Sequence, residues 1–338
     1  EVYYHSPENG MNLFKKTAVT LLAYGGPNWF WRAATRAARQ PLVVAYHRVL
    51  SGSERFVDRT QGDVTAAEFE KQVTYLLRTR RWTTLGELVC GADGAGPAFA
   101  VTFDDGYGDT YGVAFPILRK LGMTATAFIT TEVASGRAWF WWDRLAYALS
   151  ESIGKKFQVG GRYYHLENEE AADSAQAALT PRLKSSACSE AVVEDIEYQL
   201  DVANGVPEGL YLSWEEVRAL YAEGWEIGAH SQTHRILTSL TGEEARADIE
   251  ACSSRIEREI GERPRLFAYP NGQPGDYDDG VIACLRGAGF LGAVTMVGGP
   301  VTERTDPFRI SRVAPRGGEP WALFLLRLSG LYDKVKSV

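Results

Sequence analysis

Two aspartates and two histidines are the residues of this chain best suited to chemistry. Asp104 and Asp105 stand side by side where the apolar run "AFAVTF" ends, and His230 and His234 lie four positions apart in "GAHSQTH". An ionised carboxylate is costly to bury unless a cation or a hydrogen-bond donor pairs with it. Two imidazoles at this spacing can lie on one face of a helical turn and bind a metal ion together. Two histidines and one carboxylate leave coordination positions open on zinc or a similar ion, as hydrolysis requires.

The paired acids can divide two tasks between them. One carboxylate can bind the metal, while the other stays off the metal and takes a proton from water. A plain turn after the strand would account for Gly106, but not for an acid pair together with a histidine pair. A histidine pair alone is weak evidence, because such pairs are more often packed or exposed to solvent. The combination of both pairs favours a hydrolytic metal site.

The elements that must position these residues alternate along the chain. Apolar runs predict strands over 42–47, 98–103, 125–130, 226–231, 265–270, 291–296 and 308–314. Helices are predicted near 65–79, 110–121, 213–224, 242–260 and 278–288, with capping-box spacing at Thr65 and Glu68 and at Ser213 and Glu216. This alternation indicates an α/β fold with a parallel sheet, which can be a barrel or an open doubly wound sheet. Either architecture gathers its chemistry at the C-terminal strand ends.

Residues 131–212 interrupt the alternation. The stretch "AWFWWDRLAYALS" predicts an aromatic-faced helix, and "KFQVGGRYYHLE" predicts a hairpin around Gly160–Gly161. The remainder reads as helix interrupted at Pro181. We interpret the segment as an inserted helical and hairpin segment that covers one end of the sheet, not as an independent domain.

Composition excludes several classes of protein. The chain has 338 residues, of which 45% are hydrophobic and 23% charged, with a net charge of −7, so it is globular in composition. No basic run suggests nucleic-acid binding. The four cysteines are far apart, which argues against a disulfide framework or a cysteine zinc site. No apolar run is long enough for a membrane span.

The first 40 residues form a segment of their own. Met11 is typical of an initiator, so residues 1–10 are interpreted as a tag remnant. "KKTAVTLLAYGG" is similar to a weak signal peptide without a cleavage site, and residues 12–40 predict amphipathic helix that packs on the protein or rests on a membrane surface. We therefore expect a cytoplasmic or cytoplasmic membrane-surface location, with a periplasmic or secreted one as the alternative. The expected catalytic domain spans 41–320, and a C-terminal helix 321–338.

Two motifs carry a resemblance to a known family. "TFDDG" at 102–106 and "HSQTH" at 230–234 resemble the first two motifs of the NodB-homology polysaccharide deacetylases, carbohydrate esterase family 4. The resemblance spans roughly 42–315, and "AYHRV" at 45–49 is similar to the start of many members. It implies a distorted seven-stranded (β/α) barrel, which matches the predicted strands. It also implies metal-dependent removal of acetyl groups from a carbohydrate, with N-acetyl expected before O-acetyl.

The resemblance also implies roles for the four polar residues. Asp104 would be the catalytic base, and Asp105, His230 and His234 would bind the metal. The expected cofactor is a divalent ion, zinc first, with cobalt, nickel or iron as alternatives. That ion would polarise the acetyl carbonyl and lower the pKa of water, which Asp104 would deprotonate.

The segment "AYPNG" at 268–272 falls where the family has an Arg-Pro-Pro-Tyr-Gly-like motif. There Asn271 would offer its backbone N–H to the oxyanion, and Tyr269 and Pro270 would wall the acetyl pocket. A simple Pro-Asn-Gly turn explains the same residues, and both interpretations can hold together.

The chain departs from the family pattern twice. Ala268 stands where the family has an arginine that braces the base, and Arg312 in the last strand is the candidate replacement; an ordinary salt bridge is the alternative. No histidine follows His234, so the late histidine of the family is missing. His47, at the end of the first strand, is the candidate general acid and resembles the histidine of subfamilies that act on β-linked N-acetylglucosamine exopolysaccharides. A histidine hydrogen-bonded at a strand end is the alternative.

Aromatic side chains can contact the apolar faces of sugars, and Tyr107, Tyr111 and Trp141 are candidates. For Trp141, core packing of the 131–212 segment is an equally good explanation. Two other functions stay open. A related amidase could act on a small acylated sugar, nucleotide- or lipid-linked, if 131–212 closed the pocket. A catalytically silent carbohydrate-binding protein could also have kept the fold.

Overall fold

The computed structural model describes residues 40–52, 54, 56, 62–91, 96–184, 188–202, 205, 207–330 and 332. Within these ranges the chain forms two compact units. The larger unit takes its described residues from 17–51, 63–137 and 208–338, and the smaller one takes them from 52–62 and 138–207. Residues 1–10, interpreted above as a tag remnant, and nearly all of the predicted segment 12–40 lie outside the described residues. No helix in the described ranges is long and apolar enough to cross a membrane.

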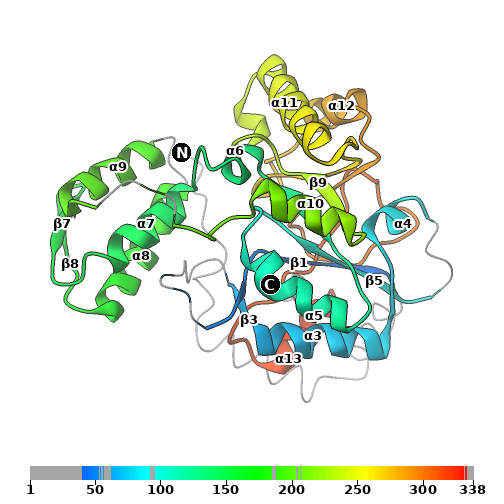
Figure 1. Ribbon diagram of the computed structural model, residues 1–338, viewed down its shortest axis with the longest axis horizontal. Helices are drawn as coiled ribbons and strands as arrows, with labels where there is room; N and C mark the ends of the chain where they lie inside the picture. The colour runs from blue at the N-terminus through cyan, green and yellow to red at the C-terminus, as the bar shows by residue number, and fades with distance from the viewer. Residues whose placement is uncertain are drawn as a thin grey trace. The chain divides into compact units, whose positions relative to one another are not determined.

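A curled parallel sheet forms the centre of the larger unit (Figure 1). Its strands lie side by side in the order β1, β5, β6, β9, β10 and β11, and each neighbouring pair is parallel. The short strand β4 pairs with the beginning of β5. Their bounds are β1 Leu42–Tyr46, β4 Arg81–Trp82, β5 Ala98–Phe103, β6 Thr126–Ile129, β9 Glu226–Ala229, β10 Leu266–Ala268 and β11 Gly292–Val294.

The sheet closes into a barrel through residues 310–313. Ile310 forms a parallel bridge with Val294 of β11, and Val313 forms one with Val44 of β1. The N–H of Ala45 donates to Val313 O at 2.9 Å, which joins this segment to β1. The distorted seven-stranded barrel is therefore confirmed. The predicted strand over 308–314 is reduced to these two bridges, because prolines at 307 and 315 limit the run that can join a ladder.

Burial explains why the strands are almost continuously apolar. Every residue of β1, β5 and β6 is buried, as expected for parallel strands covered on both faces. One core cluster joins side chains of these strands to the surrounding helices, with Phe103, Trp225 and Phe267 among its largest members. Layers of this kind hold the strand ends in fixed positions, which a site built on those ends requires.

The helices predicted from sequence are present with small shifts. They are α3 Ala66–Thr79, α5 Phe115–Lys120, α10 Trp214–Ala222, α11 Gly242–Ile260, α12 Asp279–Gly287 and, within the predicted 321–338, α13 Trp321–Leu328. The structure has two further short helices that were not predicted, α4 Leu85–Val89 and α6 Thr131–Ala134. The capping boxes of Thr65 with Glu68 and Ser213 with Glu216 are confirmed. The single helix predicted over 110–121 is a π-helical turn, Thr110–Ala114, followed by α5. A small parallel ribbon joins β2 Val49–Leu50 to β3 Val64–Thr65.

The smaller unit has a hydrophobic core of its own. The interpretation of 131–212 as a segment that covers one end of the sheet did not predict this core. It holds α7 Trp141–Ser150, α8 Glu169–Lys184, α9 Ser189–Leu200 and a hairpin of β7 Lys156–Val159 and β8 Arg162–His165. The hairpin at Gly160–Gly161 is confirmed. The predicted break at Pro181 is wrong, because this proline lies inside the last turns of α8, where only one backbone hydrogen bond is lost. That the segment covers one end of the sheet stays a prediction.

Candidate active site

The predicted site residues of the barrel follow the C-terminal ends of its strands. Asp104 and Asp105 follow β5, His230 follows β9, and His47 follows β1. Hydrogen bonds between neighbouring strand ends hold these residues at the same level of the sheet. Asp104 N–H donates to Tyr46 O and His230 N–H donates to Ile129 O, both at 3.0 Å. The parallel sheet thus brings residues far apart in sequence to one rim, as the strand-end argument predicted.

Asp105, His230 and His234 converge. Oδ1 of Asp105 lies 3.2 Å from Nε2 of His230 and 3.3 Å from Nε2 of His234. The ligand atoms of the three residues lie within 4.8 Å of one another, and Asp105 and His230 are buried while His234 is partly exposed. This oxygen of Asp105 is buried, yet it has no hydrogen-bond partner among the described residues. These three side chains could hold a metal ion, and a His₂Asp set suits zinc and similar divalent ions.

A loop, not a helical turn, brings the two histidines together, so the predicted helical geometry is wrong. Ser231 and His234 both have φ of 60°, in the left-handed region. The Oγ of Ser231 accepts a hydrogen bond from the N–H of His234 at 2.8 Å, which holds the loop closed. Asp105 is left-handed too, with φ of 72°. Backbone strain at non-glycine residues is costly, and its concentration on two of the three converging side chains marks a functional site.

The orientation of His230 is set from behind. Its Nδ1 lies 2.7 Å from the carbonyl oxygen of Ala268, which can only accept, so Nδ1 carries the proton. Nε2 then presents its lone pair toward Asp105 and His234, which is the arrangement of a metal-ligating histidine. Burial alone would raise the pKa of the Asp105 carboxyl; when the imidazoles of His230 and His234 are protonated, their N–H groups and positive charge outweigh burial and hold that pKa well below its ordinary value.

Arg312 lies against Asp104. Its Nη1 and Nη2 donate to the two carboxylate oxygens of Asp104 at 2.7 and 2.6 Å. Its Nε donates to Thr295 O at 2.9 Å, and Nη1 also contacts Oγ1 of Thr102. Burial would raise the pKa of Asp104, but Arg312 more than compensates and lowers that pKa below its usual value. The expected reach of Arg312 into the site is present; a part in catalysis stays a prediction.

His47 is half-buried on the same rim. It lies close enough to Asp104 and Asp105 that its positive charge would lower the pKa of both carboxyls. Its place is therefore compatible with proton transfer at this site, and its role as an acid stays a prediction.

In the loop after β10, Tyr269 and Pro270 are buried, whereas Asn271 is partly exposed. Tyr269 is fully buried: its hydroxyl donates to Phe308 O at 2.9 Å, and its ring stacks on Tyr277. Pro270 is buried as well. Core packing thus accounts for both residues, and their contact with an acetyl group stays a prediction. Asn271 is left-handed with φ of 62°, its side chain donates to Asp276, and its backbone N–H has no acceptor among the described residues.

The aromatic candidates pack within the protein. Tyr107 is buried, with its ring centroid 5.4 Å from that of Tyr211. Tyr111 stacks on Phe115. Trp141 belongs to the smaller unit, where it packs against that unit's core. A sugar contact by any of these residues stays a prediction.

Sequence reasoning missed a buried ion pair made by Arg48, the residue after His47. Arg48 Nε lies 2.7 Å from Asp109 Oδ2, and the N–H of Val49 donates to the other oxygen of Asp109. Both charged side chains are 7% exposed. The pair joins the loop after β1 to the loop after β5, which carries the aspartates. In the sequence, Arg48 lies within "AYHRV" and Asp109 lies three positions after "TFDDG".

Comparison with known proteins identifies relatives of this chain. The sequence profile described as "Polysaccharide deacetylase" matches residues 92–292, which is more than half of the chain. The chain belongs to the polysaccharide deacetylase family. The resemblance read from "TFDDG" and "HSQTH" is thereby confirmed, and the chain is a hydrolase of a family that acts on carbohydrates.

Three similar proteins have low sequence identity to this chain. A Bacillus subtilis (strain 168) protein named "Putative polysaccharide deacetylase YxkH" is 25% identical over 225 residues, which are 60% of this chain and 68% of that protein. The Streptococcus pyogenes deacetylase PplD has a similar structure, with a TM-score of 0.55 at 14% identity, over 82% of this chain and 92% of that one. A de-N-acetylase from Aggregatibacter actinomycetemcomitans aligns with a TM-score of 0.54 at 15% identity, over 85% and 99%. At these identities the two structures show a shared fold.

Proposed function

We propose that this chain is a metal-dependent deacetylase that removes N-acetyl groups from a saccharide. The observation that carries the proposal is the convergence of Asp105, His230 and His234 within 4.8 Å, next to a buried Asp104 that Arg312 holds. Family membership supports deacetylation of a carbohydrate. The structural similarity to a de-N-acetylase favours an amide substrate over an ester.

Asp105, His230 and His234 would hold the metal. The buried Asp105 oxygen without a hydrogen bond, and the fixed tautomer of His230, both fit a cation at this point. A divalent ion there would supply Lewis acidity to a water molecule and to the acyl carbonyl. Zinc suits this ligand set best, with cobalt, nickel and iron as the alternatives.

Asp104 would take the proton from the attacking water. Because Arg312 lowers its pKa, the carboxyl is ionised at neutral pH and available as a base. Each carboxylate oxygen has two lone pairs, and Arg312 uses one on each oxygen. The remaining lone pairs can accept a proton, while the bidentate contact keeps the carboxylate from rotating.

Asn271 and His47 would complete the reaction. A left-handed Asn271 presents a backbone N–H without an acceptor, which can donate to the oxyanion that forms when water adds to the acyl carbon. His47 would donate a proton to the nitrogen as the carbon–nitrogen bond breaks. The products are acetate and a free amino sugar, so one water is consumed for each acetyl group removed.

Acetate release tests the proposal. N-acetylglucosamine oligomers, an O-acetylated sugar polymer, and nucleotide- and lipid-linked N-acetyl sugars would be compared with chelated and zinc-restored protein. We expect zinc-dependent release from the N-acetylated oligomers. Asp105→Asn should lose zinc and activity, whereas Asp279→Asn, at an exposed carboxylate on α12, should keep both. Preference for the small linked sugars would select the amidase alternative, and no release from any donor would contradict the proposal.

A further inference from the structure

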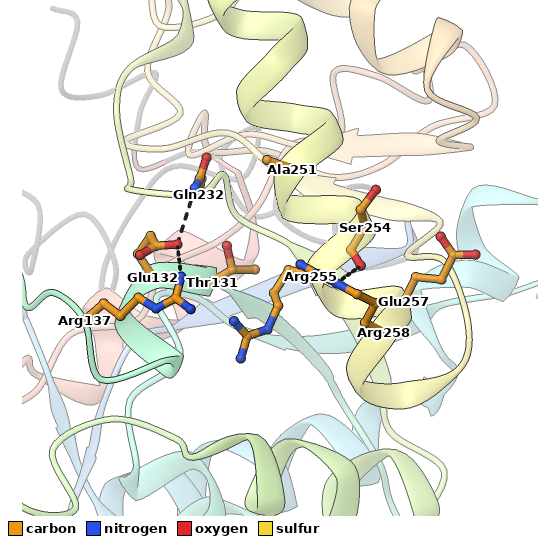
Figure 2. Close-up of a pocket in the computed structure, with 9 residues that line it drawn as sticks. All are labelled: Thr131, Glu132, Arg137, Gln232, Ala251, Ser254, Arg255, Glu257 and Arg258. Carbon is orange, nitrogen blue, oxygen red and sulfur yellow. Dashed lines mark hydrogen bonds and ion pairs between the residues drawn. The ribbon is translucent and has the colours of Figure 1, made fainter.

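A recess lies on the larger unit, between α6 and α11 (Figure 2). Its volume is about 610 Å³, and none of its lining residues is among the proposed ligands, base or acid. Ala251, Ser254, Arg255 and Arg258 line it from one face of α11, at helical spacing. Arg137 and Glu132 line it from the side of α6. We call this recess the arginine groove.

Three guanidinium groups set the character of the arginine groove. Arg258 has a single hydrogen bond, to Ser254 O of its own helix at 3.2 Å, and no carboxylate lies within ion-pair distance of it among the described residues. Arg137 is 64% exposed and only loosely paired with Glu132, at 3.5 Å. A guanidinium has five donors in a planar fork that matches a carboxylate or phosphate. Arg137 and Arg258 therefore keep most of their donors for a ligand.

Arg255 provides a rigid part of the same wall. Its side chain is 20% exposed and lies over the ring of Trp214, 4.9 Å from the centroid. It is paired with Glu259 at 2.9 Å, one turn further along α11. Its position is thus fixed by packing and by an ion pair, so ordering it costs a ligand little.

The rest of the lining suits hydroxyl groups more than a bare anion. Thr131, Gln232 and Ser254 offer neutral donors and acceptors, and Glu132 and Glu257 offer acceptors. A small anion would meet these two carboxylates as repulsive neighbours and would leave most of the volume unfilled. A sugar ring needs donors and acceptors around its hydroxyls, and an acidic sugar adds one group for the arginines. The mixed lining favours that ligand.

The arginine groove is joined to the histidine loop through Gln232, which lies between His230 and His234. The N–H of Gln232 donates to Asp248 Oδ1 of α11 at 2.9 Å, and its carbonyl accepts from the N–H of Glu132 at 3.0 Å. Its side chain reaches Glu132 as well, as the dashed line in Figure 2 shows. The outer side of the histidine loop is therefore part of the groove wall.

We propose that the arginine groove is an accessory binding site for an acidic sugar residue, one that carries a carboxylate. The assignment of this sugar to the substrate rests on the proposed function, because the acidic residue would belong to the same saccharide whose acetyl groups are removed at the neighbouring rim. The binding of an acidic sugar to the groove does not depend on the proposed function. Arg258 and Arg137 hold the carboxylate, and the neutral side chains contact the ring hydroxyls.

Calorimetric titration of the full chain tests the groove without relying on activity. The probes are glucuronic acid oligomers and neutral glucose oligomers of the same length. We expect glucuronate oligomers to bind, with an affinity that falls as salt rises, and glucose oligomers to bind much more weakly. Arg258→Gln should weaken glucuronate binding about tenfold, and adding Arg137→Gln should weaken it further. Both side chains are exposed, so these variants should keep the melting temperature of the wild type.

Arg246→Gln is the matched control, because Arg246 is an exposed arginine of α11 that does not line the groove. It should bind glucuronate oligomers like the wild type. Equal binding of both oligomers, or an equal loss in Arg246→Gln and Arg258→Gln, would overturn the groove proposal. Groove binding without acetate release from any donor would retain the groove and reject the proposed function. Acetate release together with unchanged glucuronate binding in Arg258→Gln would retain the proposed function and reject the groove.

Discussion

Arg312 donates two hydrogen bonds from its guanidinium to the two carboxylate oxygens of Asp104, at 2.7 and 2.6 Å. Both side chains of this ion pair are fully buried. The two residues are 208 positions apart in the chain, and the closing segment of the barrel carries the arginine. The segment that closes the barrel therefore also carries the side chain that holds the proposed base.

Removing the arginine should destabilise the fold. Arg312→Met leaves a carboxylate buried without its cation, and breaking one partner out of a buried pair costs about 3–5 kcal/mol. Urea denaturation at neutral pH measures the change in the free energy of unfolding. Arg312→Met combined with Asp104→Asn should recover part of the loss, because the amide needs no counter-charge. A double variant as unstable as the single one would contradict this account of the pair.

The same pair predicts a dependence on pH. Since the folded-state pKa of Asp104 lies below its unfolded value, its stabilising contribution is present above the unfolded pKa and disappears as pH falls through the folded pKa. Arg312→Lys keeps the positive charge but loses the bidentate hydrogen bonding to Asp104, so the pKa of Asp104 should rise. The acidic limb of kcat/KM should then move to higher pH than in the wild type. Metal content measured at each pH separates this shift from loss of the ion, and an unmoved limb would count against Asp104 as the base.

Zinc should stabilise the folded chain through the three converging residues. A ligand that binds only the folded state raises the melting temperature with its concentration. We expect such a rise in the wild type and none in His230→Gln or His234→Gln. His165→Gln, at an exposed histidine in the hairpin of the smaller unit, should respond like the wild type. An equal response in all four proteins would place zinc elsewhere.

His47 can be tested by varying the leaving group. If His47 protonates the departing amine, His47→Gln should slow release from an N-acetyl sugar by about 10²–10⁴-fold. Release from an aryl acetate should fall far less, because an aryl oxide leaves without a proton. The ratio of the two rates is the informative quantity. A similar loss on both substrates would assign His47 a structural role at its strand end.

The sequence predicted the parts of the fold that local patterns control. Six of the seven strands, the capping boxes and the hairpin at Gly160–Gly161 follow from apolar runs and turn chemistry. The seventh position of the barrel depends on bridges at Ile310 and Val313, which are tertiary contacts that no local run specifies. The core of the smaller unit likewise needs contacts between α7, α8, α9 and the hairpin.

The site divides in the same way. The two motif pairs could be found because buried acids and paired histidines demand an explanation by chemistry. The left-handed loop at Ser231 and His234 could not, because four-residue spacing fits a helical turn as well. Tyr269 illustrates another limit: position next to a motif does not tell which way a ring points, and this ring packs inward on Tyr277.

The most direct test of the account is acetate release from N-acetylglucosamine oligomers by Asp104→Asn at a measured zinc content. If Asp104 is the base and Asp105, His230 and His234 hold the ion, the variant should bind as much zinc as the wild type. Its release should fall by about 10²–10⁴-fold. Full zinc content with undiminished release would contradict the role of Asp104, and absence of zinc from the wild type would contradict the metal site itself.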